Sequence, residues 1–300
     1  MGTPEFSVPS LKLLNKEFGV DLVVTLPDKQ KGRGQKFQPT DVKKAAMELN
    51  LPILQPESLK SDDFINQLRE FEPDIMVVIA FKFLTPSVFT IPKLGCFNVH
   101  ASLLPKYRGA APINWAIING DKTTGLTTFL LQEKIDTGNI LLQKEFKIPD
   151  GFTAGDLYEF LMPEAAQMAV DTTRLLISGD YKPYPQDNSM ATSAPKIFPE
   201  FCKINWMQFA LDIRNFIHGV SPIPGAWTIM NGQRFKILRV DYCSCGTGLP
   251  GKYIIDEDDM VVFCKKGVLS LVEVQPQGKR VMKISEFLNG YRGNSEGFFE

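Results

Sequence analysis

Residues 95–120 read G-C-F-N-V-H-A-S-L-L-P-K-Y-R-G-A-A-P-I-N-W-A-I-I-N-G, and the rest of the chain is organised around this stretch. The short apolar segment Cys96–His100 is predicted to form a strand. Pro112 suits the first turn of a helix, which we expect over Ile113–Ile118, with Gly120 near its end. Strand, polar loop and helix in this order are typical of α/β folds, which place their active sites just past the carboxyl end of a strand.

Two polar side chains, Asn98 and His100, interrupt the apolar strand. Side chains alternate across a strand, so residues two positions apart point to the same face. A carboxamide and an imidazole side by side can donate two hydrogen bonds to one oxygen atom, an arrangement that stabilises a developing oxyanion. The alternative is a buried Asn and His that only satisfy backbone groups, and the spacing alone favours neither interpretation.

Composition indicates an ordinary globular protein with enough length for about two domains. The 300 residues are 44% hydrophobic and 22% charged, with a formal net charge of −1, which does not by itself indicate a nucleic-acid partner. The longest clean apolar run, Ile75–Phe81, is far too short to cross a bilayer. Five scattered cysteines, an odd number, suggest reduced thiols and therefore a cytoplasmic location.

Residues 1–180 alternate between helical and strand-like patterns, which predicts an α/β domain with a mostly parallel, Rossmann-like sheet and helices on both faces. Runs dominated by apolar and β-branched residues, such as Val20–Leu26 and Ile75–Ile79, are typical of strands buried on both faces. Residues 27–40 lack periodicity and are expected to form a loop. Further strands are expected over Pro52–Leu54, Leu126–Leu131 and Ile140–Phe146, and helices over Ser7–Phe18, Asp41–Asn50 (capped by Asp41), Ser61–Phe71 and Thr153–Ile177.

The remainder of the chain divides into a linker and a second domain. Residues 181–203 hold prolines and polar residues with little periodicity, as expected of a linker, and residues 204–300 carry short strand-like runs separated by turn signals. The pair Asn231-Gly232 predicts a tight hairpin. After a helix over Asn205–Ile217, several strands in so short a region predict a small β-barrel, OB-like domain.

Five segments of the chain form a recognisable set: F-N-V-H-A-S-L-L-P-K-Y-R-G-A-A-P-I at 97–113, I-D-T-G at 135–138, M-G-T-P-E-F at 1–6, P-D-K-Q-K-G-R-G-Q-K at 27–36 and V-Q-P-Q-G-K-R-V-M at 274–282. Together they resemble the folate-dependent formyltransferases. The resemblance implies transfer of a formyl group from 10-formyltetrahydrofolate through a tetrahedral oxyanion intermediate, without a metal ion. The G-R-G loop and the carboxy-terminal segment favour members whose acceptor is the amino group of methionine on initiator methionyl-tRNA.

The resemblance also implies which residues form the site. Asn98, His100 and Asp136 match the catalytic residues of the family, with Asp136 orienting His100 and accepting a proton rather than only shaping its own turn. His218 stands where the family often has Arg, and we expect it to face solvent at a helix C-terminus. The expected folate-site residues are Ser102, Leu103, Leu104 and Pro105 and, from an earlier loop, Ala80, Phe83 and Leu84.

Basic residues in two parts of the chain are candidate tRNA contacts. Residues 29–44 hold six Lys or Arg residues against a single acidic one, Asp41. A tRNA needs phosphate contacts of this kind, although a charge run is more often only a solvated face. We expect the protein to act as a monomer. The candidate residues are Lys31, Arg33, Lys36, Lys279 and Arg280.

Three other interpretations remain open. A small amine or water could replace the tRNA as acceptor. A dinucleotide-dependent oxidoreductase would need G-x-G-x-x-G between a strand and a helix, and neither G-T-P-E-F nor G-R-G fits this pattern. A non-catalytic RNA-binding protein would not need Asn98, His100 and Asp136 together.

The first residues of the chain lead to a further expectation. In the family, M-G-T-P follows a first strand of about five apolar residues that lies centrally in the sheet, whereas here the motif begins at Met1. An unfilled central position would leave unpaired backbone groups in the core. We therefore expect the natural protein to begin several residues upstream, unless another segment occupies that place.

Overall fold

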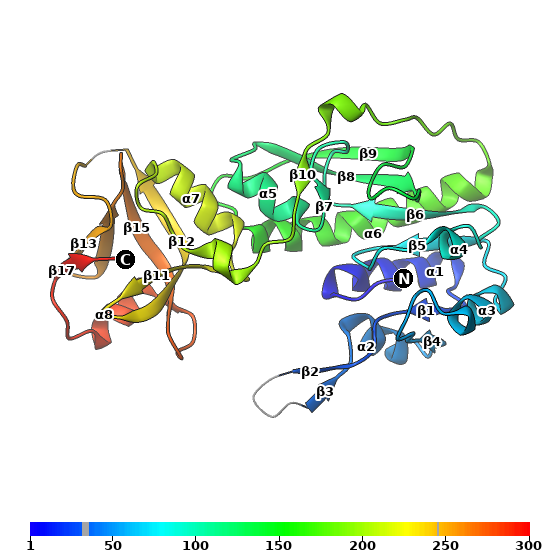
Figure 1. Cartoon of the computed structure of the whole chain (residues 1–300), viewed down its shortest axis with the longest axis horizontal. Helices are drawn as coiled ribbons and strands as arrows, with labels where there is room; N and C mark the ends of the chain where they lie inside the picture. Colours follow the sequence, from blue (N-terminus) through cyan, green and yellow to red (C-terminus); the bar gives the residue numbers. More distant parts are fainter. Residues whose placement is uncertain (32–35, 245) are drawn as a thin grey trace. The chain divides into compact units, whose positions relative to one another are not determined.

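The computed structural model describes residues 1–31, 36–244 and 246–300, which fold into two compact units (Figure 1). Unit 2 includes two short segments that precede Ala194 in the chain, one of which carries most of helix α5 (Pro112–Ile118). No helix in the described ranges is both long and apolar enough to cross a membrane. Unit 1 contains Met1–Pro112, Thr124–Phe146 and Tyr158–Ser193, and unit 2 contains Ile113–Thr123, Lys147–Leu157 and Ala194–Glu300.

The central sheet of unit 1 has four strands in the order β5-β6-β8-β9. Strand β6 (Gly95–His100) lies between β5 (Ile75–Val78) and β8 (Thr123–Leu130), and β9 (Ile140–Lys147) forms the edge beyond β8. Strand β6 runs parallel to β5 and antiparallel to β8. Hydrogen bonds on both sides fix the backbone of β6, so the residues at its carboxyl end have a defined position.

A second, two-stranded sheet pairs β1 (Val23–Val24) in parallel with β4 (Ile53–Leu54). The first residues of the chain connect it to the central sheet, because the N–H of Gly2 donates to the oxygen of Val24 at 3.1 Å and the N–H of Ile79 donates to the oxygen of Met1 at 3.0 Å. Strand β1 is shorter than the sequence predicts, because regular pairing with β4 is limited to two residues.

Helices pack against the sheets of unit 1 (Figure 1). Helix α2 begins after Thr40, whose Oγ1 accepts the backbone N–H of Lys43 at 3.1 Å, so the expected cap, Asp41, lies in the first turn instead. Helix α6 contacts β8, where the hydroxyls of Thr172 and Thr128 lie 2.9 Å apart. The helices of this unit are α1 (Val8–Phe18), α2 (Asp41–Glu48), α3 (Asp62–Glu70), α4 (Pro86–Phe89) and most of α6 (Ala154–Ser178), after a 3-10 turn at Glu5–Ser7.

The loop predicted over residues 27–40 is wrong in part, because a hairpin forms there. Strands β2 (Lys29–Lys31) and β3 (Lys36–Gln38) pair antiparallel. A strand is recognised from sequence by apolar residues that alternate toward a buried face. Phe37, the apolar residue of β3, is 69% exposed, so no such alternation marks the hairpin.

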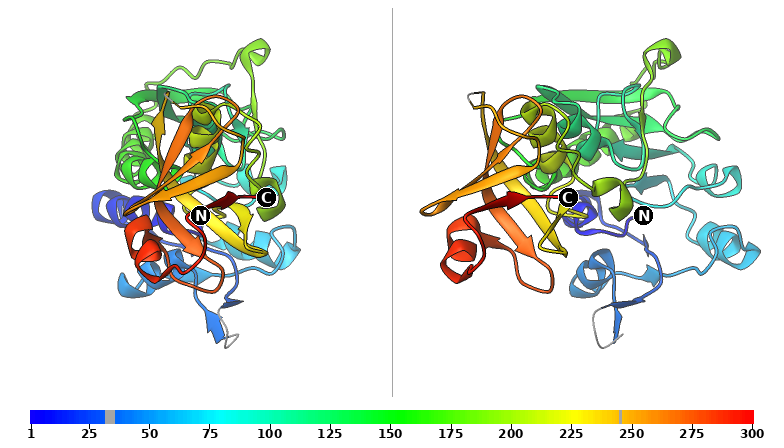
Figure 2. Two further views of the ribbon diagram at one scale, coloured as in Figure 1. Left: turned by 90° about the vertical axis from the view of Figure 1, so that its left-hand side faces the viewer. Right: turned by 60° about the vertical axis from the view of Figure 1, so that its left-hand side comes forward.

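Unit 2 is built on an antiparallel sheet in the order β11-β12-β15-β14-β13-β17, with β16 beside β15. The sheet is curled (Figure 2), and its two ends meet, because Glu300, just after β17, exchanges backbone hydrogen bonds of 3.1 and 3.2 Å with Ile229 of β11. The predicted α/β fold, with a Rossmann-like first part and a small β-rich second part, is therefore confirmed.

The elements of unit 2 follow one another closely along the chain. The strands are β11 (Ala226–Met230), β12 (Gln233–Cys243), β13 (Lys252–Asp256), β14 (Asp259–Phe263), β15 (Val268–Pro276), β16 (Met282–Lys283) and β17 (Glu296–Phe298). Besides most of α5, unit 2 contains the helices α7 (Ala210–Gly219) and α8 (Ile284–Gly290). Outside the sheets named above lie the short strands β7 (Arg108–Gly109) and β10 (Ser193–Ala194) and 3-10 turns at Asn188–Met190 and Pro199–Cys202.

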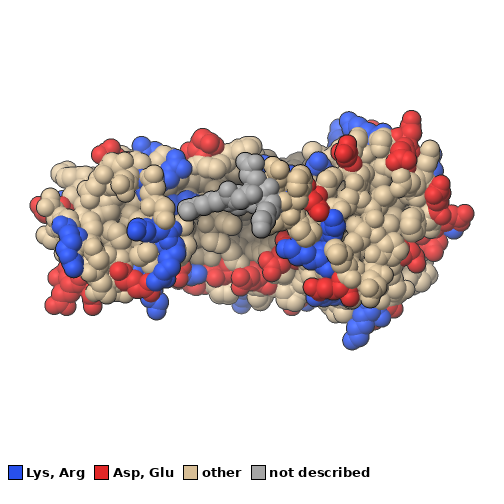
Figure 3. All heavy atoms as spheres, turned by 90° about the horizontal axis from the view of Figure 1, so that it is seen from below, with Lys and Arg blue, Asp and Glu red and all other residues tan. Residues whose placement is uncertain are grey.

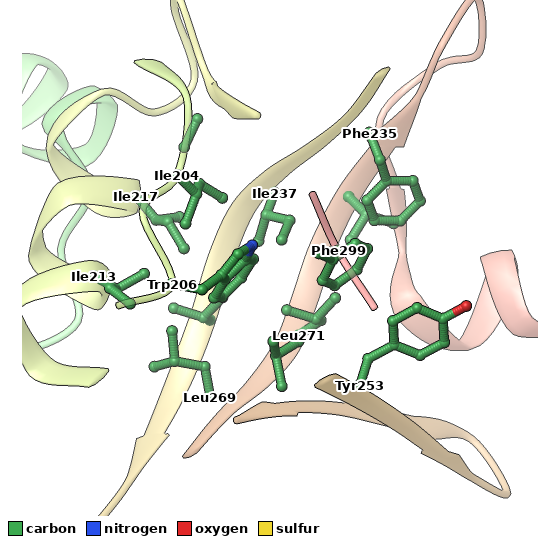
Figure 4. Close-up of a cluster of buried hydrophobic side chains, with 14 of the residues drawn as sticks. Ile204, Trp206, Ile213, Ile217, Phe235, Ile237, Tyr253, Leu269, Leu271 and Phe299 are labelled. Carbon is green, nitrogen blue, oxygen red and sulfur yellow. The ribbon is translucent and has the colours of Figure 1, made fainter. Parts of the chain in front are cut away.

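The core of unit 2 is rich in aromatic rings (Figure 4). Trp206 stacks on Phe299 with ring centroids 5.5 Å apart, and Phe299 also contacts Tyr253 and Phe235. Helix α7 packs its buried isoleucines into the same cluster. Each ring buries a large apolar area, so the four buried rings contribute to the stability of this small unit together with the aliphatic side chains around them.

The turn between β11 and β12 forms at the predicted pair Asn231-Gly232. Both residues have a left-handed backbone, with φ of 51° and 74°, which Asn tolerates and Gly adopts without steric cost. Met230 pairs with Gln233 across the turn, so the two-residue hairpin is confirmed.

His218 is buried, so the expectation that it faces solvent is wrong. The residue is 3% exposed, and its Nε2 lies 3.1 Å from the oxygen and 3.2 Å from the nitrogen of Val240. Burial lowers the pKa of the imidazole from 6.5 to about 4, and the guanidinium groups of Arg214 and Arg239 add to the effect. A helix C-terminus is often exposed, but here the last turn of α7 packs against β12.

We expect unit 2 to lose stability as the pH falls from 6.5 to 4. The unfolded chain binds a proton on His218 near pH 6.5, whereas the folded unit binds it only near a pKa of about 4, so the full stability is present above pH 6.5. At pH 5 the loss is on the order of 2 kcal/mol. Urea unfolding followed by tryptophan fluorescence measures it, because all three tryptophans, Trp115, Trp206 and Trp227, belong to unit 2.

His218→Gln is the control for this measurement, because it removes the titrating ring. The variant should lose far less stability than the wild type between pH 7 and pH 5. The Asp150 carboxyl, whose pKa the hydrogen bond from Arg214 holds below its usual 3.8, titrates outside this interval. A pH-dependent loss that is equal in the wild type and the variant would show that His218 is not its source.

Candidate functional site

His100 lies at the carboxyl end of β6 and is 6% exposed. Its Nε2 is 2.8 Å from the backbone oxygen of Tyr107. A carbonyl oxygen only accepts hydrogen bonds, so Nε2 carries the hydrogen and donates it. The neutral ring therefore presents an unprotonated Nδ1 on its other side.

Nδ1 of His100 faces the carboxylate of Asp136, with Oδ2 at 3.8 Å. This separation is too long for a hydrogen bond, but protonation of Nδ1 would create an ion pair with Asp136. The same Oδ2 accepts the backbone N–H of Gly109 at 2.8 Å, which orients the carboxylate. The pair can therefore take up a proton at Nδ1 and hold it beside a fixed negative charge.

The turn that carries Asp136 has little conformational freedom. Asp136 has a left-handed backbone with φ of 53°. Gly138 packs so closely on β8 that a Cβ there would lie 1.7 Å from the backbone oxygen of Leu130. Glycine is required at this position because no side chain fits, and the close approach fixes the turn against the sheet.

Asn98 lies two residues before His100 on β6, and strand alternation puts both side chains on one face. Asn98 is half-buried, and its carboxamide makes no hydrogen bond to any residue within the described ranges, so its NH₂ group is available to a ligand. The predicted two-donor arrangement is restricted in one respect. Because Nε2 of His100 is bound to Tyr107, the ring can donate to a ligand oxygen only from a protonated Nδ1.

Thr127 of β8 holds the loop that follows β6, and the sequence carries no signal for this role. Its Oγ1 donates to the oxygen of Ser102 at 2.6 Å and accepts from the N–H of Leu104 at 3.1 Å and from Nε2 of Gln143 at 3.0 Å. A hydroxyl has one donor and two acceptor positions, so all three are used. Gln143 Nε2 also lies 2.7 Å from the oxygen of Leu104, which fixes the loop backbone further.

The predicted folate residues lie on two loops at the carboxyl ends of neighbouring strands. Residues 102–105 follow β6, and the loop that begins at Ala80 follows β5, which is parallel to β6 and adjacent to it. Ala80 has a left-handed backbone with φ of 47°, and Phe83, three residues further along the loop, is 51% exposed. Leu84 is 1% exposed, so its side chain supports the loop from the core rather than facing a ligand.

The candidate tRNA contacts lie on different elements. Arg33 lies outside the described residues, whereas Lys31 and Lys36 stand opposite each other in the β2–β3 pair. Lys279 and Arg280 lie between β15 and β16, and Nη2 of Arg280 is 2.7 Å from a carboxylate oxygen of Glu286. On the face drawn in Figure 3, basic and acidic side chains are interspersed.

No group of three His, Cys, Asp or Glu side chains within residues 1–31, 36–244 and 246–300 is placed to hold a metal ion. Cys96, Cys202 and Cys264 are buried free thiols. The site therefore offers an imidazole, a carboxylate and a carboxamide as its chemical groups.

Two family models match most of the chain. A formyl transferase model matches residues 5–173, and a model of the formyl transferase C-terminal domain matches residues 196–292. Methionyl-tRNA formyltransferases of Thermodesulfovibrio yellowstonii and Caldanaerobacter subterraneus are each 43% identical to the chain. The first alignment covers 98% of this chain and 95% of the relative, and the second covers 97% and 96%.

Solved structures of sugar formyltransferases share the fold. WlaRD, a sugar 3N-formyl transferase solved in the presence of dTDP and 5-N-formyl-THF, has a TM-score of 0.68 at 22% identity over 93% of this chain and 97% of its own. The N-formyltransferase of Helicobacter canadensis, solved with folinic acid and dTDP-3-aminofucose, has a TM-score of 0.65 at 21% identity over 92% and 97%. At these identities the similarity concerns the fold alone.

We expect Thr127→Val to lower the free energy of unfolding of the chain by about 2–3 kcal/mol, because it leaves buried polar groups of the loop without a partner. Thr127→Ser keeps the hydroxyl and loses only a methyl group, so it should cost about 1 kcal/mol. Urea unfolding followed by far-ultraviolet circular dichroism measures both. The hydrogen-bond account fails if the valine variant is as stable as the serine variant.

Proposed function

The chain belongs to the methionyl-tRNA formyltransferase family, and we propose that Asn98, His100 and Asp136 carry out its chemistry. The protein is an enzyme that transfers a formyl group from 10-formyltetrahydrofolate to the amino group of methionine on initiator methionyl-tRNA. One observation carries the assignment of residues: His100 faces Asp136 at 3.8 Å at the end of β6, with the free carboxamide of Asn98 on the same face.

Asn98 stabilises the charge that develops during transfer. The reaction forms a bond between the methionine nitrogen and the formyl carbon, and it breaks the bond between that carbon and N10 of the folate. Between these events the formyl oxygen carries negative charge. The Asn98 NH₂ group donates to this oxygen, and a well-placed donor of this kind contributes roughly 3–4 kcal/mol to the transition state.

His100 and Asp136 move the proton. The attacking amine must be neutral and must lose a proton as the new bond forms. Nδ1 of His100 takes this proton, because Nε2 is committed to Tyr107, and the Asp136 carboxylate stabilises the resulting imidazolium. The imidazolium then returns the proton to N10 of the leaving folate, so the residues end the reaction as they began it.

The loops at residues 80–85 and 102–105 are proposed to bind the folate. They follow the carboxyl ends of β5 and β6, and β6 carries Asn98 and His100; open α/β sheets bind their ligands at this end of their strands. The hydrogen bonds from Thr127 and Gln143 give residues 102–105 a rigid backbone. Exposed Phe83 offers an apolar surface to the flat pteridine ring.

The tRNA is proposed to contact cations of both parts of the chain. Lys31 and Lys36 are paired across β2 and β3, and lysine is suited to phosphate contacts, which position an RNA without reading its sequence. We assign donor chemistry to residues 1–180, a linking role to residues 181–203 and tRNA binding to residues 204–300, and infer that the enzyme acts as a monomer in the cytoplasm. The proposed contacts are Lys31, Arg33, Lys36, Lys279 and Arg280.

The direct test of the proposed function mixes the purified chain with 10-formyltetrahydrofolate and charged initiator tRNA and measures formyl-methionine by mass spectrometry after hydrolysis of the ester. Uncharged initiator tRNA and charged elongator methionine tRNA are the controls. A dTDP-linked amino sugar tests the alternative acceptor. Formylation of the sugar but not of the tRNA would contradict the assignment.

We expect Asn98→Ala, His100→Ala and Asp136→Ala each to lower kcat by at least about 100-fold, because each removes a group that acts in the transition state. Folate binding should persist, since the proposed folate loops keep their own hydrogen bonds. Steady-state kinetics and folate titration measure the two effects. Transfer by His100→Ala at close to the wild-type rate would rule out the mechanism.

We expect replacement of three cations of the β2–β3 region by Ala to raise the KM for charged tRNA and to flatten its salt dependence, with the KM for folate unchanged within about twofold. The control is a second triple variant that removes three exposed lysines, two from α1 and one from the turn before α3. An unchanged KM for charged tRNA would contradict the proposed contact and indicate that the hairpin is only a solvated surface. The test variant replaces Lys31, Arg33 and Lys36, and the control replaces Lys12, Lys16 and Lys60.

A further inference from the structure

Residues 186–192, here named the clasp segment, contact both loops that carry the proposed catalytic groups. We propose that Gln186 and Thr192 are positioning residues, which hold the loops of His100 and Asp136 in the arrangement that formyl transfer requires. The inference rests on the proposed function. It assigns a role in the reaction to two residues outside the catalytic and substrate contacts proposed above.

Gln186 joins the two loops with all of its hydrogen-bonding positions. Oε1 accepts from Nε of Arg108 at 3.1 Å and from Nη2 at 2.6 Å, and Nε2 donates to the backbone oxygens of Asp136 at 2.9 Å and Gly138 at 2.8 Å. A carboxamide has two acceptor positions and two donor hydrogens, so none is left for solvent. A reversed amide would turn its NH₂ toward the guanidinium and its oxygen toward two carbonyls, so these contacts determine its orientation.

Thr192 holds the loop on the other side of the site. Its Oγ1 accepts the N–H of Tyr107 at 2.8 Å, and its backbone oxygen accepts the N–H of Arg108 at 2.8 Å. Tyr107 has a φ of 61°, a left-handed conformation that a bulky residue keeps only when its surroundings enforce it. The oxygen of Tyr107 accepts the Nε2 hydrogen of His100, so Thr192 acts on the imidazole through one residue.

The contacts of Gln186 and of Thr192 both affect the distance between the His100 imidazole and the Asp136 carboxylate. Gly109, the residue after Arg108, donates its N–H to Oδ2 of Asp136, and Nδ1 of His100 lies 3.8 Å from that oxygen. The clasp segment holds the backbone of Tyr107 and Arg108, which contacts the imidazole, and it also holds the backbone of the Asp136 turn. A small displacement between the two groups would slow the chemical step more than it would weaken substrate binding.

Residues that only stabilised the fold would respond differently to substitution. Gln186→Glu preserves size and keeps the pairing with Arg108, but it turns an oxygen toward the carbonyls of Asp136 and Gly138 in place of two donor hydrogens. The added negative charge also favours the protonated imidazole, so the base would lose its proton at a higher pH. If Gln186 only stabilised the fold, its substitution would lower the melting temperature and leave kcat and its pH dependence unchanged.

The test compares the wild-type chain with Gln186→Glu, Thr192→Val and Thr192→Ser in steady-state formylation at 25 °C, where melting curves show each variant folded. We expect kcat to fall by about tenfold or more in Gln186→Glu and Thr192→Val, with both KM values within about twofold of the wild type. Thr192→Ser retains the hydroxyl and should restore the rate. The acid limb of the kcat/KM profile should move to higher pH in Gln186→Glu.

Asn188→Ala is the matched control, because Asn188 Oδ1 accepts from the same Nη2 of Arg108 at 2.8 Å without contacting either carbonyl of the turn. Its kcat should stay within about twofold of the wild type. Wild-type kcat and pH profile in folded Gln186→Glu and Thr192→Val would overturn the positioning role alone. A wild-type chain that transfers no formyl group would overturn the proposed function and the positioning role with it, so the two failures are distinguishable.

Discussion

The hydrogen bond from Nε2 of His100 to the carbonyl of Tyr107, 2.8 Å long, determines the chemistry that the site can perform. It fixes the tautomer of a ring that otherwise exchanges its hydrogen between two nitrogens. Nδ1 is left as the basic atom, and Asp136 is the charge that it faces. In the proposed mechanism, proton transfer therefore falls to the imidazole and the carboxylate, and stabilisation of the oxyanion falls to the carboxamide of Asn98.

The loops around this bond are held by side chains whose hydrogen-bonding capacity is fully used. Thr127 uses three positions and Gln186 four, and both are buried. Fully satisfied polar networks in a low-dielectric interior specify a single arrangement, whereas partly satisfied ones are costly. This explains how loops without regular secondary structure can hold the proposed catalytic groups in a defined geometry.

Unit 2 depends on segments that are distant in sequence. Residues 113–123 and 147–157 fold with it, and the carboxylates of Asp150 and Asp156 pair there with Arg214 and Arg239. The same two guanidinium groups lie near the buried His218 and disfavour its protonation. Protonation of His218 is thus linked to the ion pairs that attach residues 147–157 to this unit.

The sequence by itself determined the features that arise from neighbouring residues. Alternation along β6 placed Asn98 and His100 on one face, and Asn231-Gly232 specified its hairpin, because backbone geometry and turn propensity are local. The family motif indicated Asp136 as a further candidate for the site. Burial of His218 and the pairing of β2 with β3 had no such local signal, and the sequence prediction failed at both.

Only the tertiary structure decided how the loops of the site are held. Gln186 contacts Asp136 across 50 positions of the chain, and Thr192 contacts Tyr107 across 85. No periodicity or propensity relates residues so far apart, since such contacts exist only after the chain has folded. For the same reason, the nitrogen of His100 that carries the hydrogen depends on the carbonyl that the fold brings to it.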